Sequence, residues 1–60
     1  MRRLKEIRIK RGLSAEHMAK ALGLKTTNAY YKKENGKIKI STDEAKIISK
    51  ELGVPFEKIF

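Results

Sequence analysis

The feature that most constrains this chain is a pair of short helical segments separated by only three residues. The first repeats apolar residues at i, i+3, i+4 and i+7, which predicts an amphipathic helix with Ser14 as its N-cap. The second begins at Thr26 or Thr27, whose hydroxyl can accept from a first-turn N–H group, and stops at Asn35-Gly36. Gly23-Leu24-Lys25 forms a tight joint between them. The apolar residues of the first segment are Ala15, Met18, Ala19 and Leu22.

Two short helices joined in this way, with polar side chains on the outer side of the second, predict a helix-turn-helix. If Tyr30 points inward, Asn28 and Lys32 share the opposite face of the second helix. Thr27 and Tyr31 then lie at the flanks of that face. Such amide, hydroxyl, phenol and ammonium groups can read base edges in DNA. The alternative interpretation of the same pattern is an ordinary solvated helix face.

Helical patterns also flank this pair. Residues 4–11 predict a first helix that ends at Gly12, with Ile9 on its solvent side. Ser41-Thr42-Asp43-Glu44 has the pattern of a capping box, and the helix that it opens stops at Gly53. Residues 54–60 predict a last short helix with Pro55 in its first turn. All regular structure is therefore expected to be α-helical.

An alternating segment, Lys37-Ile38-Lys39-Ile40, separates the second helix of the pair from the capping box. Four residues are too few to build a sheet, so we predict an extended loop. In that loop Ile38 and Ile40 are expected to point inward, while Lys37 and Lys39 face outward beside the preceding helix.

The charge of the chain is high and unevenly placed. Its 60 residues, enough for one domain over residues 1–60, carry a net charge of +8. Residues 1–39 hold twelve Lys or Arg against three acids, a net of +9, whereas residues 40–60 have a net of −1. This asymmetry indicates a polyanion partner on one side of the molecule.

The composition also argues against other classes of function. There is no cysteine, which suits a cytoplasmic protein and leaves no disulfide or thiolate metal site. His17 is the single histidine, so neither a metal site nor a catalytic constellation is expected, and no cofactor or small-molecule ligand is evident. No apolar run approaches the ~18 residues of a membrane span. We therefore expect neither an enzyme nor a membrane partner.

Several short motifs resemble the Cro/repressor-type (XRE-like) helix-turn-helix family over nearly the whole chain. The resemblance implies a compact five-helix bundle of the lambda-repressor-like type, with its third helix in the DNA major groove. It also implies a prokaryotic or phage-type regulator, with Ala19 where the two helices nearly touch and Gly23 in the turn. The motifs are Gly12-Leu13-Ser14, Met18-Ala19, Leu22-Gly23-Leu24, Glu34-Asn35-Gly36 and Leu52-Gly53-Val54.

The chain departs from the family pattern at two places. Many members begin the second helix with a Gln that binds a phosphate, and this chain has Ala15. The segment from Gly23 to Gly36 is one residue longer than the commonest pattern, and Lys33 stands where the family has an apolar side chain. Counting back from Asn35-Gly36 makes Tyr30 the inward anchor; a register shifted by one residue is the alternative.

The function expected from these features is sequence-specific binding of double-stranded DNA by a transcriptional regulator, a repressor, with the helix around Thr27–Asn35 in the major groove. The alternative is a protein-interaction module on the same fold, such as an antitoxin or an antirepressor. One short recognition helix reads few base pairs, so a homodimer, at least on DNA, is expected. The base-reading candidates are Thr27, Asn28, Tyr31 and Lys32; the phosphate-contacting candidates are Ser14, Lys25, Thr26, Asn35, Lys37 and Lys39; the candidates for a dimer contact are Ile47, Phe56 and Phe60.

Overall fold

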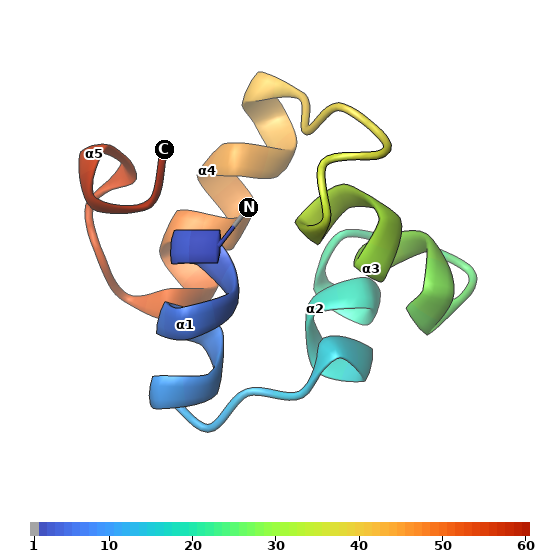
Figure 1. Ribbon diagram of the computed structural model, residues 1–60, viewed down its shortest axis with the longest axis horizontal. Helices are drawn as coiled ribbons and strands as arrows, with labels where there is room; N and C mark the ends of the chain where they lie inside the picture. Colours follow the sequence, from blue (N-terminus) through green and yellow to red (C-terminus); the bar gives the residue numbers. More distant parts are fainter. Residues whose placement is uncertain (1) are drawn as a thin grey trace.

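A computed structural model describes residues 2–60 and confirms the all-α fold, with five helices joined by short loops in that range (Figure 1). Met1, the first residue of the domain predicted over residues 1–60, lies outside the described residues. The first helix starts at Arg2 and ends at Lys10, so it begins two residues earlier and ends one residue earlier than predicted. The helices are α1 (Arg2–Lys10), α2 (Ala15–Ala21), α3 (Thr27–Glu34), α4 (Thr42–Leu52) and α5 (Phe56–Ile59).

The joint between α2 and α3 is a tight turn, as the sequence predicts. Leu22 is the C-cap of α2, and the N–H group of Leu24 donates to the carbonyl of Ala19 at 2.9 Å. Gly23 adopts a φ of +71°, in the left-handed region, although a Cβ there would meet nothing within 4 Å. Backbone conformation, and not lack of space, therefore favours glycine at this position.

Every helix contributes a fully buried side chain to one core. The largest apolar ones come from α1 to α5 in turn: Leu4, Met18, Tyr30, Ile48 with Leu52, and Ile59. Leu22 was expected on the inner stripe of α2 but is only half-buried, because it caps the helix end and packs against the edge of the core. Ile9 is 58% exposed, as predicted.

The predicted capping box opens α4. Ser41 Oγ accepts from the Glu44 N–H group at 3.1 Å, and Glu44 Oε1 accepts from the Ser41 N–H group at 2.9 Å. Gly53 ends the helix with a φ of 68°. Pro55 is the N-cap of α5 and not a residue of its first turn, because its ψ of 147° is still extended.

The loop between α3 and α4 departs from the prediction at Ile38, which is 43% exposed instead of directed inward. The N–H groups of Lys37 and Ile38 both donate to the carbonyl of Lys32, at 2.8 and 3.2 Å. The chain is therefore still turning out of α3 at Ile38, and the alternation of an extended segment does not apply there. Ile40 is half-buried and packs against the core, as predicted.

Candidate nucleic-acid interface

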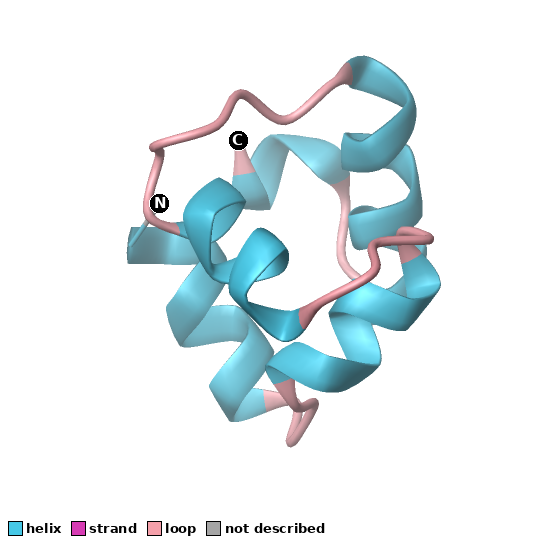
Figure 2. Ribbon diagram, turned by 90° about the vertical axis from the view of Figure 1, so that its right-hand side faces the viewer, coloured by secondary structure: helices cyan, strands magenta, loops and turns pink. Residues whose placement is uncertain are grey.

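Helix α3 lies at the outer edge of the view in Figure 1, and Figure 2 shows the molecule from that side. Thr26 is its N-cap, with Oγ1 accepting from the Ala29 N–H group at 3.1 Å. Asn35 is its C-cap, and Gly36 follows with a φ of 82°. The helix expected around Thr27–Asn35 therefore ends at Glu34, with both ends defined by the residues that the sequence indicates.

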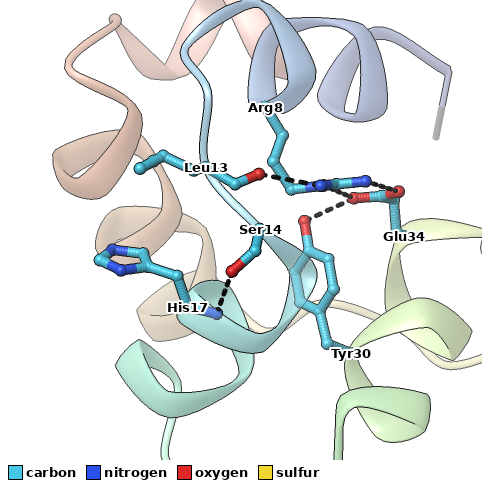
Figure 3. A network of polar contacts seen from close by, with 6 residues as sticks. All are labelled: Arg8, Leu13, Ser14, His17, Tyr30 and Glu34. Atoms are coloured by element: carbon cyan, nitrogen blue, oxygen red, sulfur yellow. Dashed lines mark hydrogen bonds and ion pairs between the residues drawn. The ribbon is translucent and has the colours of Figure 1, made fainter.

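The inner face of α3 carries Tyr30 and Glu34, which are 0% and 1% exposed. The Tyr30 hydroxyl donates to Glu34 Oε2 at 2.6 Å. Arg8 of α1 donates from Nε to the same oxygen at 2.8 Å and from Nη2 to Oε1 at 3.3 Å. Its Nη1 donates to the carbonyl of Leu13 at 2.9 Å (Figure 3). We call Arg8, Tyr30 and Glu34 the buried network.

The buried network fixes the rotation of α3 about its own axis. Its hydrogen bonds are directional, and they link α3 to α1 and to the segment that leads into α2 (Figure 3). Burial is the main reason why the pKa of Tyr30 is raised far above its usual range, so its hydroxyl remains a donor. The hydrogen bond to Glu34 raises the pKa of Arg8 and keeps it charged.

Sequence reasoning placed Tyr30 inward, which the structure confirms, but it missed Glu34. The available signal was spacing: Glu34 follows Tyr30 by four residues and so shares its face of α3. Arg8 likewise follows the buried Leu4 by four residues. Spacing therefore places one charged residue on the inner face of each helix, whereas their pairing depends on how the two helices cross.

The face of α3 opposite the buried network carries the predicted base-reading residues. Asn28 and Lys32 are exposed, one helical turn apart. Tyr31 is 42% exposed, and Thr27 is half-buried at the flank of that face. The structure therefore brings these four side chains together on one side of one helix.

Most of the predicted phosphate-contacting residues border α3. Lys25 and Thr26 precede it, Asn35 ends it, and Lys37 and Lys39 lie in the following loop, all of them exposed. Ser14 is exposed at the start of α2, where its Oγ accepts from the His17 N–H group at 3.0 Å (Figure 3). Within residues 2–60 the ammonium groups of Lys25, Lys32, Lys37 and Lys39 form no ion pair.

Lys33 differs from the other lysines near α3, because its side chain is only 11% exposed. Its Nζ lies 3.1 Å from Glu44 Oε1 and donates to the carbonyl of Lys39 at 3.3 Å. A long apolar stem with a charged tip can replace an apolar side chain in this way. Lys33 therefore occupies the inner side of α3 without changing the register set by Tyr30.

The residues predicted for a dimer contact lie on α4 and around α5. Phe56 is 44% exposed, and its ring centroid lies 4.9 Å from that of the half-buried Phe60. Ile47 is 38% exposed on α4. A hollow between the two helices is lined by Thr42, Lys46, Ser49, Phe56 and Glu57.

The described residues contain no cluster of three or more His, Asp or Glu side chains that could hold a metal ion. The exposed His17 instead places its Nε2 2.6 Å from Glu51 Oε1, which links α2 to α4. None of the helices within residues 2–60 has both the length and the apolar character needed to cross a membrane.

Helix α3 is anchored by the buried network, joined to α2 by the turn at Gly23, and bordered by basic loops. This arrangement defines a helix-turn-helix DNA-binding domain. A family model described as "Helix-turn-helix" matches residues 4–59, and the chain belongs to this family, in its Cro/XRE-like branch. The family consists of DNA-binding regulators that are generally not enzymes. No curated protein and no solved structure matches the chain.

Proposed function

We propose that this protein is a sequence-specific, double-stranded DNA-binding transcriptional regulator that acts as a repressor in the cytoplasm. The observation that carries the proposal is the polar outer face of α3, opposite the buried Tyr30 and Glu34. An eight-residue helix fixed in rotation can present the same side chains to the major groove in every complex. Occupying an operator in this way excludes other proteins from the same DNA.

Base readout follows from the chemistry of that face. Asn28 can pair with adenine through two hydrogen bonds, and Lys32 can donate to O6 and N7 of guanine. Thr27 offers a methyl group to thymine. Tyr31 is exposed far enough for its hydroxyl to reach a base edge or a neighbouring phosphate.

The phosphate contacts surround the base-reading face. Lys25 and the Thr26 hydroxyl lie before α3, and Asn35 lies at its end. Lys37 and Lys39 follow in the exposed loop. The Ser14 oxygen accepts from a backbone N–H group, so its own proton remains available for a phosphate at the start of α2.

The site is tested by selecting bound duplexes from a random pool, in parallel for the wild type and for Asn28→Ala. We expect a defined consensus for the wild type and relaxed selection at one position for the variant, at a cost of about 1–3 kcal/mol. Lys50→Ala, an exposed substitution on α4, is the matched control and should leave the consensus unchanged. Absence of any enriched duplex would contradict the proposal. If Asn28→Ala selected the same consensus as the wild type, the base-reading residues would instead be Thr27 and Tyr31.

We also propose that two copies bind a palindromic site with half-sites about 10 bp apart, through a contact that includes Ile47, Phe56 and Phe60. The exposed Phe56 ring, in contact with that of Phe60, supports this choice. Sedimentation equilibrium at tens of micromolar and a footprint on the selected duplex test it. A monomer that protects only one half-site would rule out the dimer.

The same exposed side chains, Ile47 and Phe56, favour a second candidate function, a protein-interaction module such as an antitoxin or an antirepressor. A pull-down in high salt distinguishes the two, because electrostatic DNA binding collapses there while an apolar protein contact persists.

A further inference from the structure

One ion pair joins the recognition helix to the start of α4. Lys33 Nζ lies 3.1 Å from Glu44 Oε1, and the two side chains are only 11% and 19% exposed. The same Glu44 oxygen accepts from the Ser41 N–H group at 2.9 Å, and Lys33 Nζ also donates to the carbonyl of Lys39 at 3.3 Å. We call Lys33 and Glu44 the clasp. The clasp therefore binds two backbone groups of the loop, the carbonyl of Lys39 and the N–H group of Ser41.

The two exposed lysines of this loop depend on different contacts. Lys37 is fixed by α3 itself, because its N–H group donates to the carbonyl of Lys32 at 2.8 Å. The backbone of Lys39 is held instead by the side chain of Lys33, through its carbonyl oxygen. Loss of the Lys33 side chain should therefore free Lys39 and leave Lys37 in place.

The charge of Lys33 already has a partner within the protein. The pKa of Glu44 is lowered first by the hydrogen bond from the Ser41 N–H group and then by Lys33, so the carboxylate is ionised at neutral pH. An ammonium group that is largely buried against an ionised carboxylate is poorly placed to reach a phosphate as well.

We propose that Lys33, together with Glu44, is a positioning residue for the DNA interface: it contacts no DNA and holds the backbone of Lys39 so that the Lys39 ammonium group reaches a phosphate. This inference rests on the proposed function. Lys33 then acts by positioning Lys39 and not by contacting DNA itself. A count of positive charges would not distinguish these two roles.

The test is a pair of double-mutant cycles on a duplex that the wild-type protein selects, with affinity measured between 50 and 200 mM salt. One phosphate contact changes the salt slope by about 0.9, so losing it should reduce the fall in affinity over this range by about 3.5-fold. We expect about this change for Lys33→Met, for Lys39→Ala and for the double variant, because all three lose the same phosphate contact. Lys37→Ala is the matched control. The Lys33→Met/Lys37→Ala variant loses two separate contacts, so its fall in affinity should be reduced by about 12-fold.

Two results would overturn the inference while leaving the proposed function intact. The first is a Lys33→Met variant that binds like the wild type; the second is a Lys33→Met/Lys39→Ala variant whose effects multiply, as they would if Lys33 contacted its own phosphate. A wild type that selects no duplex would overturn both proposals.

Circular dichroism melting identifies any variant that fails to fold. If Lys33→Met is unfolded, the same cycles are run with Glu44→Gln, which keeps the capping-box acceptor and removes the carboxylate charge. The inference is supported if Glu44→Gln changes the salt dependence less in the Lys39→Ala variant than in the Lys37→Ala variant. It is overturned if Glu44→Gln has the same effect in both variants.

Discussion

Removing the positive charge of the buried network should destabilise the protein strongly. In Arg8→Met the carboxylate of Glu34, 1% exposed, loses both hydrogen bonds from the guanidinium and keeps only that from Tyr30. Breaking a buried ion pair from one side costs about 3–5 kcal/mol, because the remaining charge is left uncompensated. At ~0.05–0.15 kcal/mol per residue, a domain of this size has a total stability of about 3–9 kcal/mol. The single substitution should therefore unfold a large share of the molecules.

The matching apolar replacement should reverse most of that loss. Arg8→Met combined with Glu34→Leu and Tyr30→Phe removes both charges and the hydroxyl that would otherwise lose its acceptor. Replacing a buried pair by apolar residues of similar volume is often neutral or stabilising. We therefore expect the triple variant to fold, at a cost set by how well its new side chains pack.

Urea unfolding followed by circular dichroism measures both effects. Lys5→Met is the control, since Lys5 is an exposed cation on the same helix and its replacement should change stability by no more than about 0.5 kcal/mol. The reasoning is refuted if Arg8→Met costs no more than Lys5→Met, or if the triple variant is less stable than the single one.

Three further predictions follow from burial, charge and titration. Leu22→Ala should lower the free energy of unfolding by about 2 kcal/mol, the low end for a cavity, because Leu22 is half-buried; urea unfolding measures it. The folded pKa of Glu44 lies below its usual value, so its contribution to stability is present at pH 7 and should be lost as the pH falls from the ordinary glutamate pKa of about 4.3 through the lower folded pKa; comparison with Glu44→Gln over pH 2–7 tests this. The logarithm of DNA affinity should fall with that of salt with a slope of about −4 to −5 per protomer, and a slope near zero would argue against groove docking.

The sequence predicts the ends of α2, α3 and α4 well because the deciding contacts are local. Ser14, Thr26 and Ser41 each accept from an N–H group three residues further along, at 3.0 to 3.1 Å. Gly23 and Gly53 take the left-handed conformation that a helix end favours. Such contacts need no knowledge of the rest of the fold.

The inner polar contacts were not predictable in the same way. Arg8 and Glu34 are 26 residues apart, and Lys33 and Glu44 are 11 apart. Periodicity treats a charged residue as a surface residue unless its partner is known, and the partner is set by how the helices cross. The outward turn at Ile38 has a similar cause, because it depends on two hydrogen bonds to the carbonyl of Lys32.

The inner face of α3 is held by polar contacts in two directions, in addition to the packing of Tyr30 in the core. Tyr30 and Glu34 connect it to α1 through Arg8, and Lys33 connects it to α4 through Glu44. Hydrogen bonds of 2.6 to 3.1 Å weaken quickly when their angles change, so these contacts restrict rotation of α3 about its axis. Reading base edges requires side chains held within roughly 0.5 Å and 10–20° of a productive geometry. Substitutions on this hidden face should therefore alter base preference as well as stability, although none of these side chains lies on the proposed DNA-facing side of α3.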